Sequence, residues 1–299
     1  MKQVPYSGPA FVKANGIDII YDTFGDPGEP PIVLISGLSM QMIEWVERFC
    51  EMLASRGYYV IRYDNRDVGL SQKIDELGVP RIQDLLQKVA RGEHIKVPYL
   101  LSNMADDAVG LMDALGIDSA NFVGVSMGGM IAQEIAIHHP ERMRSLTSIM
   151  STTGDPNLPQ AKPSAMTVLM TPMPLEKERY VDAFVHACRV LKGPSTSLDE
   201  PALRRLALRC FERGIHPTGV ARQLAAIIAS GSRKHALNGV KIPTLVIHGD
   251  SDPLVPVECG IDTANAIPGA KLKIIKGVGH ELPPDIWKEV VDAISDIAC

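Results

Sequence analysis

A serine with the spacing of an activated nucleophile lies in the segment GVSMG, residues 124–128, where an apolar run gives way to a helical pattern. A serine hydroxyl attacks a carbonyl carbon efficiently only when a base takes its proton and a third group holds that base in the right tautomer. Both partners occur downstream, because Asp250 and Asp252 follow an apolar run and His280 lies in a glycine-rich loop. Ser126, His280 and one of these aspartates therefore predict nucleophilic acyl-transfer chemistry.

The two glycines around Ser126 suit a sharp turn between a strand and a helix. Glycine lacks a Cβ, so the flanking chain can pass close to the turn, while a non-glycine residue at its tip is tolerated only where the surrounding structure enforces it. A helix beginning at Met127 would also aim free N–H groups at a developing oxyanion. A buried structural hydroxyl is the alternative role for Ser126, but its position at a predicted strand-to-helix junction favours a nucleophile.

Short apolar runs alternate with helical segments along most of the chain, which is typical of a parallel sheet with helices on both faces. Asn15-Gly16 separates two strand-like runs and predicts a hairpin, because that turn needs positive φ at both central residues. The other runs that predict strands are IVLISG, YYVIRYD, ANFVGV, SLTSIM, IPTLVIHG and KLKIIKG. Helices are expected over residues 42–56, 103–116, 127–139, 257–266 and 284–297. The fold class is α/β.

Two segments interrupt this alternation. Residues 151–239 contain no strand-like run, are rich in proline and methionine, and include several helical stretches. Because a structureless loop of that length is improbable inside a compact domain, we expect a helical cap there, inserted after the sixth strand. Residues 72–101, with the amphipathic stretch IQDLLQKVARG, are expected to form a smaller insertion. The core would then comprise residues 1–150 and 240–299.

Composition and charge argue against several classes of partner. The 299 residues are 45% hydrophobic and carry a net charge of −5 without a basic stripe, so no nucleic-acid partner is expected. No stretch of about 18 uncharged apolar residues occurs, so membrane insertion is not expected either. The N-terminal segment, with Pro5 and Pro9 and no apolar run, does not resemble a signal peptide, and we expect a cytoplasmic location.

The cysteines predict neither a disulfide framework nor a zinc site, because their number is odd and no C-x-x-C pair occurs. They are Cys50, Cys188, Cys210, Cys259 and Cys299. Most are expected to be small core residues, and the terminal Cys299 is expected to be exposed. Since no His, Asp, Glu or Cys group has ligand spacing either, we expect no metal and no cofactor.

Two downstream motifs identify a family. HGDSDPLVP, residues 248–256, is similar to the α/β-hydrolase pattern H-G-x-x-D-x-x-V-P, and GVGH, residues 277–280, resembles the family's G-x-G-H. With GVSMG and the chain order Ser126, Asp252, His280, these motifs resemble the α/β-hydrolase superfamily. The resemblance implies a mostly parallel eight-stranded sheet flanked by helices, with an inserted helical cap. It assigns Asp252 as the triad acid, whereas Asp250 falls at a variable position and His248 is a structural member of its motif.

The resemblance also implies an oxyanion hole made by backbone N–H groups of Met127 and Leu38. The loop that contains Leu38, LISGLSMQMIEW, has Ser36 where the family usually has histidine. The turn DNRDVGLS, residues 64–71, has Asp67 in place of a family glycine, and its Asp64 and Arg66 are expected to serve the turn structurally. These segments, together with VARQLAAI and GVGHELP, resemble bacterial carboxylesterases and the aclacinomycin methylesterase-like branch.

The resemblance implies hydrolysis of small to medium apolar carboxylic esters by water through an acyl-enzyme at Ser126. Imidazole titrates near pH 6.5 when unperturbed, so activity is expected to fall below roughly that pH. The same machinery could cleave a carbon–carbon bond, a thioester or a lactone, and the fold also serves as a ligand receptor without turnover. A monomer and a homodimer are both compatible with the sequence.

Overall fold

The computed structural model describes residues 4–298, so the expectation for Cys299 lies outside the described residues. Its strands are β1 (Tyr6–Ala14), β2 (Ile17–Phe24), β3 (Pro31–Ile35), β4 (Tyr59–Tyr63), β5 (Ala120–Val125), β6 (Met143–Ile149), β7 (Thr244–Gly249) and β8 (Lys271–Ile275). They form one sheet in the order β1-β2-β4-β3-β5-β6-β7-β8. β2 runs antiparallel to both of its neighbours, and the remaining pairs are parallel. The expected mostly parallel eight-stranded sheet is confirmed.

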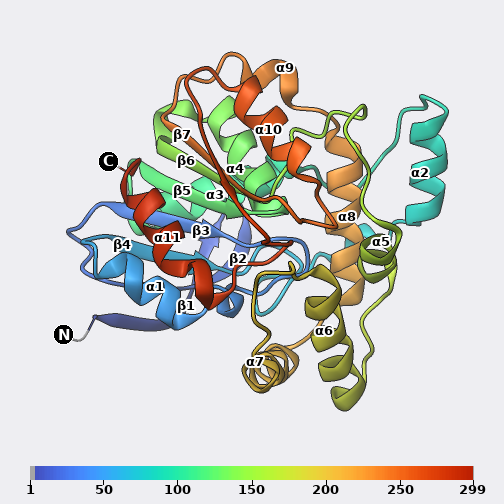
Figure 1. The fold of residues 1–299 in the computed structure, drawn as a ribbon, viewed down its shortest axis with the longest axis horizontal. Helices are drawn as coiled ribbons and strands as arrows, with labels where there is room; N and C mark the ends of the chain where they lie inside the picture. The colour runs from blue at the N-terminus through green and yellow to red at the C-terminus, as the bar shows by residue number, and fades with distance from the viewer. Residues whose placement is uncertain (1–3, 299) are drawn as a thin grey trace.

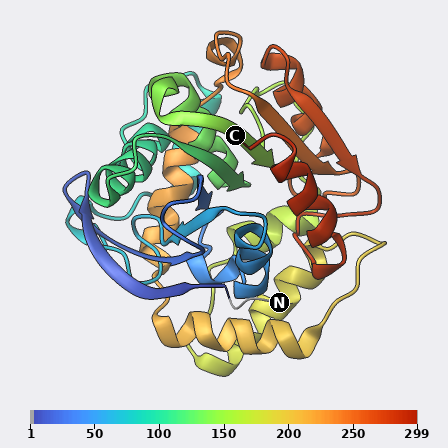
Figure 2. The same cartoon turned by 90° about the vertical axis from the view of Figure 1, so that its left-hand side faces the viewer.

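The first hairpin forms at the expected dipeptide. Asn15 and Gly16 have φ values of 49° and 81°, the left-handed conformations that a tight two-residue turn requires. The β1–β2 hairpin, blue in Figure 2, curls along one edge of the sheet.

The helices that accompany the sheet are α1 (Glu47–Ala54), α3 (Leu101–Leu115), α4 (Met127–His138), α10 (Val257–Ala266) and α11 (Pro284–Ser295). Met104 of α3 and Ile131 of α4 pack with Phe122 of β5 in one apolar cluster. Phe49 of α1 and Val290 of α11 pack on the other face. Every residue of β5 is buried. Since successive strand side chains point to opposite faces, both faces of β5 are covered, which explains why its apolar run is continuous rather than alternating.

One predicted helix is divided in two. Residues 42–56 hold a short 3-10 turn, Met42–Glu44, and then α1, with extended backbone at Val46 between them. The carbonyl oxygen of Trp45 accepts from the buried Arg62, while the Phe49 N–H donates to Val46. The periodicity could not reveal this break because it depends on a residue of the next strand.

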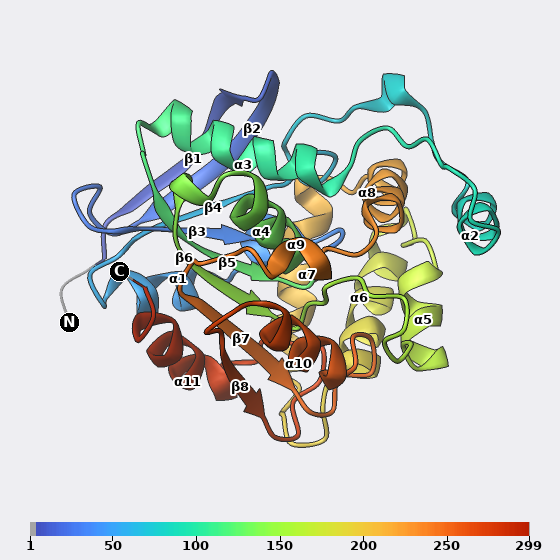
Figure 3. The same ribbon diagram turned by 90° about the horizontal axis from the view of Figure 1, so that it is seen from above.

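Residues 151–239, here called the helical insertion, connect β6 to β7. They contain α5 (Pro163–Met170), α6 (Lys177–Leu191), α7 (Glu200–Arg213), α8 (Pro217–Ser230) and the short α9 (Lys234–Leu237), and no strand. Figures 1 and 3 show α5 to α8 gathered on one side of the sheet. Tyr180 of α6 and Cys210 of α7 pack against Met42 and Ile43, which follow β3, so the insertion shares an apolar cluster with the core.

The smaller segment at residues 72–101 contains α2 (Ile82–Ala90), which lies beyond α8 in Figures 1 and 3. Leu85 is the buried residue of α2, and its neighbours Leu86 and Val89 remain exposed. No helix among residues 4–298 combines the length and apolar character that a membrane span needs.

Candidate active site

Ser126 lies at the turn from β5 to α4 in a strained backbone conformation. Its φ and ψ are 54° and −119°, a region that L-residues seldom occupy. The flanking glycines are required by close backbone contacts, because a Cβ on Gly124 would lie 2.1 Å from the carbonyl oxygen of Gly128 and a Cβ on Gly128 would lie 2.1 Å from that of Ile35. The turn is held by the Ser126 N–H, which donates to Ile149 at 2.9 Å. These contacts present the hydroxyl at the carboxyl end of the strand.

Three residues from distant parts of the chain form a hydrogen-bonded series. His280 Nε2 lies 3.1 Å from Ser126 Oγ, and His280 Nδ1 lies 2.7 Å from Asp252 Oδ2. An ionised carboxylate only accepts hydrogen bonds, so Nδ1 carries the proton and Nε2 is left to accept from the serine hydroxyl. This is the arrangement in which an imidazole can take the serine proton.

The Asp252 carboxylate is held in its ionised form. Its Oδ1 accepts from the N–H groups of Leu254 and Val255, both at 2.8 Å. Burial opposes ionisation, but the charge of His280 and hydrogen bonds from His248, His280 and Val255 hold the pKa of Asp252 well below its usual value. Asp252 is therefore the acceptor for His280 Nδ1–H.

The competing aspartate, Asp250, has other partners. Its Oδ1 accepts from the N–H of Gly277 at 2.6 Å and from the Ser251 hydroxyl at 3.0 Å. These bonds connect the loop after β7 to the loop after β8. Asp250 thus braces the loop that carries His280.

His248 contacts the loop that holds Asp252. It is fully buried, its Nε2 lies 2.7 Å from the carbonyl oxygen of Val255, and the same nitrogen lies 3.5 Å from Asp252 Oδ2. Gly260 packs directly against the ring, since a Cβ there would lie 2.4 Å from His248 Nδ1. The ring is therefore a fixed donor to the loop that shapes the aspartate.

The two predicted oxyanion donors, Met127 and Leu38, belong to two turns that meet at Ser126. Met127 is the first residue of α4, and the first N–H groups of a helix have no partner within it. Leu38 lies in the turn after β3, next to Gly37, where a Cβ would lie 3.4 Å from Ser126 Cβ. The turn after β3 is thus packed against the serine.

Ser36, at the position where a family histidine is usual, is completely buried. Its carbonyl oxygen accepts from the Asn65 side-chain amide at 3.0 Å. Its hydroxyl has no hydrogen-bond partner among the described residues. The loop is therefore held through its backbone rather than through the side chain at this position.

The turn after β4 is a network of buried ion pairs. Arg66 makes two bonds of 2.5 Å to Asp107, Arg213 of α7 bonds to Asp64, and Arg222 of α8 bonds to Asp67 at 2.6 and 2.8 Å. Two of the three arginines, Arg213 and Arg222, come from the helical insertion, far from the turn in sequence. The charges of this turn are therefore paired within the protein.

Asp67 itself explains why a glycine is usual at its position. Its φ is 70°, a left-handed conformation that favours glycine. The aspartate carboxylate accepts from Tyr99, Ile74 and Arg222. Several hydrogen bonds compensate for the backbone strain.

Sequence reasoning gave no role to Glu281, the residue after His280. Its Oε1 accepts from the N–H of Gly193 at 2.6 Å and from the hydroxyl of Thr196, both in the segment that follows α6. An acidic residue directly after the candidate base was the available signal. Its partners could not be identified because they lie in the helical insertion.

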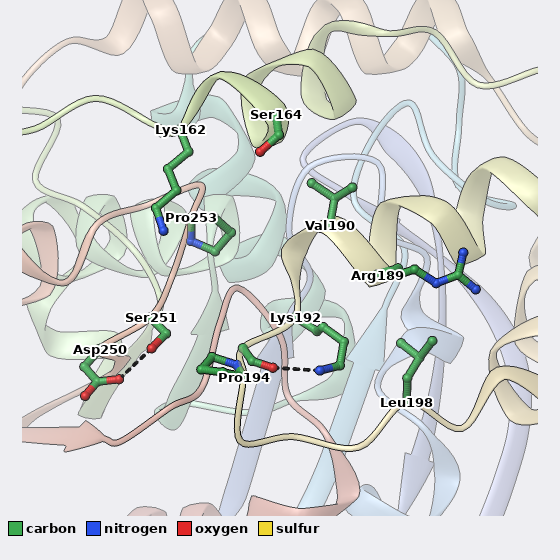
Figure 4. Close-up of a pocket in the computed structure, with 11 residues that line it drawn as sticks. Lys162, Ser164, Arg189, Val190, Lys192, Pro194, Leu198, Asp250, Ser251 and Pro253 are labelled. Atoms are coloured by element: carbon green, nitrogen blue, oxygen red, sulfur yellow. Dashed lines mark hydrogen bonds between the residues drawn. The ribbon is translucent and has the colours of Figure 1, made fainter.

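A surface groove of about 830 Å³ lies beside the loop that carries Asp252 (Figure 4). Residues around α5 and α6 form one wall, and the loop around Ser251 forms the other. Its described lining residues are Lys162, Ser164, Arg189, Val190, Lys192, Gly193, Pro194, Leu198, Asp250, Ser251 and Pro253. Ser126 and His280 are not among these lining residues. Among residues 4–298, no group of three or more His, Cys, Asp or Glu side chains could hold a metal ion.

Comparison with known proteins gives relatives and a family. The chain is 28% identical over 291 residues to rhodomycin D methylesterase of Streptomyces peucetius, covering 90% of this chain and 91% of the relative. It is 29% identical over 191 residues to 2-hydroxymuconate semialdehyde hydrolase of Pseudomonas putida, covering 61% of this chain and 63% of the relative. The enol-lactonase structure from Burkholderia xenovorans LB400 matches with a TM-score of 0.72 at 23% identity, and the match covers 96% of this chain and 99% of the enol-lactonase chain. The family model for the alpha/beta hydrolase fold matches residues 30–285, and the chain belongs to this hydrolase family.

Proposed function

We propose that this hydrolase cleaves carboxylic esters through an acyl-enzyme formed on Ser126. The observation that carries the proposal is the hydrogen-bonded series Ser126, His280, Asp252. His280 Nε2 lies 3.1 Å from Ser126 Oγ, and His280 Nδ1 lies 2.7 Å from Asp252 Oδ2. The similarity to rhodomycin D methylesterase along most of the chain supports an ester as the substrate class.

The reaction proceeds in two steps. His280 Nε2 takes the proton from Ser126 Oγ as the oxygen attacks the ester carbonyl, and the developing oxyanion accepts from the N–H groups of Leu38 and Met127. The imidazolium, stabilised by Asp252, returns the proton to the departing alcohol. Water then gives a proton to His280 and attacks the acyl-enzyme, and His280 returns that proton to Ser126 Oγ as the bond from this oxygen to the acyl carbon breaks and the acid leaves.

We also assign the helical insertion as the cap over the site, with residues 1–150 and 240–299 as the core. α6 and α7 share an apolar cluster with Met42 and Ile43, which follow the turn that contains Leu38. Apolar side chains around this turn favour small to medium apolar esters. This reaction uses protein groups and water only.

The direct test is hydrolysis of p-nitrophenyl esters of increasing acyl length by the purified protein beside Ser126→Ala. The wild type is expected to turn over the esters with an optimum chain length, and the variant is expected to lose about 10⁴-fold or more in kcat. A fluorophosphonate should label the wild type on Ser126 alone, as read by peptide mass spectrometry. Equal turnover by both proteins would exclude Ser126 as the nucleophile.

The second candidate is hydrolysis of a carbon–carbon bond by the same residues, supported by the similarity to 2-hydroxymuconate semialdehyde hydrolase. This alternative predicts cleavage of a carbon–carbon bond in 2-hydroxymuconate semialdehyde, with weak activity on simple esters. A higher kcat/KM for p-nitrophenyl esters than for the semialdehyde would favour the esterase.

A further inference from the structure

A completely buried amide connects the helical insertion to two core turns, one after β3 and one after β4. Gln223 lies on α8 with an exposed fraction of 0%. Its Oε1 accepts from the N–H of Ser39 at 3.1 Å, and its Nε2 donates to the carbonyl oxygen of Arg66 at 2.8 Å. Because one partner can only donate and the other can only accept, the orientation of the amide is fixed.

The bond to Ser39 falls on the strained peptide of a tight turn. The Met40 N–H donates to the carbonyl oxygen of Gly37 at 3.3 Å, which closes a four-residue turn. Ser39 occupies its third position with φ at 63°, the conformation for which such turns normally use glycine or asparagine. Rotation of the Leu38–Ser39 peptide would relieve this conformation and would direct the Ser39 N–H away from Gln223.

The same turn contains a proposed oxyanion donor. Rotation of the Leu38–Ser39 peptide changes ψ of Leu38, and the N–H of Leu38 belongs to the peptide immediately before it. Gly37 packs against Ser126, so the turn has little room to shift as a whole. The orientation of the Leu38 N–H is therefore sensitive to the state of the neighbouring peptide.

We infer that Gln223 is a positioning residue, which holds the turn after β3 in the orientation that lets Leu38 donate to the oxyanion. This inference rests on the proposed function, because it concerns the same site. The oxyanion forms after substrate binding, so loss of Gln223 should lower kcat and leave KM nearly unchanged. The helical insertion would then contribute directly to stabilisation of the transition state.

The test compares Gln223→Met with Gln133→Met. Gln133 is an equally buried glutamine on α4, and its amide oxygen accepts from Arg233 at 3.0 Å. With p-nitrophenyl butyrate, Gln223→Met is expected to lower kcat about tenfold with KM within about twofold, and to weaken a trifluoromethyl ketone inhibitor by a similar factor. Gln133→Met is expected to leave kcat within about twofold. An unchanged kcat in Gln223→Met would overturn the inference.

Two substitutions at the exposed Ser39 test the turn without disturbing the interior. Ser39→Val disfavours positive φ and is expected to lower kcat about tenfold. This variant tests the turn even if Gln223→Met does not fold. Ser39→Gly accepts positive φ freely, so the Gln223→Met effect should fall to about threefold or less in that background. Full kcat in Ser39→Val, or an undiminished Gln223→Met effect beside Ser39→Gly, would contradict the inference.

The parent protein and Ser126→Ala separate the two proposals. If the parent shows no Ser126-dependent ester turnover, the proposed function fails and the inference fails with it. If turnover depends on Ser126 but is insensitive to Gln223 and Ser39, the inference alone fails.

Discussion

The backbone N–H of His280 donates to the carbonyl oxygen of Leu191 at 2.8 Å, so the candidate base is tied to the last residue of α6 in the helical insertion. Two neighbouring hydrogen bonds join the same two segments, with the insertion as donor. Ser195 N–H donates to Gly277 at 3.0 Å, and Glu281 accepts from Gly193 at 2.6 Å. The segment that follows α6 thus supports the loop of the proposed base.

Glu281→Ala should loosen this loop, because it removes the acceptor for Gly193 and Thr196. We expect kcat for p-nitrophenyl butyrate to fall about tenfold with little change in KM, since the base loses orientation rather than substrate contacts. Glu289→Ala is the control, because Glu289 is half-exposed and pairs with Lys273 on the surface. An equal kcat in the two variants would show that the loop is held without Glu281.

The two aspartates after β7 should differ sharply when each is made neutral. Asp252→Asn removes the carboxylate that fixes the His280 tautomer, and we expect kcat to fall about a thousandfold or more. Asp250→Asn keeps an oxygen that can accept from Gly277 and should lower kcat by less than about tenfold. Steady-state kinetics on both variants decide the assignment, and the reverse ranking would make Asp250 the acid.

Gly128→Ala should destabilise the fold, because its Cβ would lie 2.1 Å from the carbonyl oxygen of Ile35. Neither backbone can move without disturbing the sheet, so we expect a loss of about 3 kcal/mol in the free energy of unfolding by urea. Gly239→Ala is the control, since its Cβ would lie 3.4 Å from the nearest atom. A Gly128→Ala protein as stable as the control would show that the elbow tolerates a side chain.

The sequence predicted most of the architecture and the three residues that the structure brings into hydrogen-bond contact. The hairpin at Asn15-Gly16 was accessible because the dipeptide determines its own turn, and Ser126, Asp252 and His280 were accessible because each occupies a motif with fixed chain order. The glycines of GVGH illustrate the limit. A Cβ on Gly279 would lie 2.2 Å from the carbonyl oxygen of Leu191, so this requirement arises from the insertion and not from the local sequence.

Contacts between the insertion and the core could not be predicted. Gln223 and Ser39 are 184 residues apart, and nothing in VARQLAAI indicates which backbone its amide will meet. The exchange of a family glycine for Asp67 is similar. An aspartate is unfavourable in the left-handed conformation of this turn, and the structure explains its presence by the bond from Arg222 of α8.

Asp67→Gly tests that pairing. Glycine relieves the positive φ but leaves the fully buried Arg222 without its main carboxylate, so we expect a net loss of about 3 kcal/mol in the free energy of unfolding. Adding Arg222→Met removes the unpaired charge and should recover part of the loss. Urea titrations of both single variants and the double variant give the coupling, and strictly additive losses would show that the pair is energetically independent.

Glu44 should make stability fall as the pH rises through neutrality. Burial raises the pKa of the Glu44 carboxyl from 4.5 to about 7. The hydrogen bond from the Gln41 N–H lowers this pKa, and the charge of Asp64 raises it further. Between these values the folded protein holds a proton that the unfolded chain has released, so folding is favoured at the acidic end and the advantage is lost as pH rises.

Part of the Glu44 surface remains accessible, which reduces the expected contribution to about 2 kcal/mol. Glu44→Gln stays neutral and can still accept from Gln41, so its urea stability relative to wild type should improve by about that amount between roughly pH 5 and pH 7.5. Because Asp252 and other carboxylates contribute equally to both proteins, only this difference reports on Glu44, and parallel stability profiles would contradict the raised pKa.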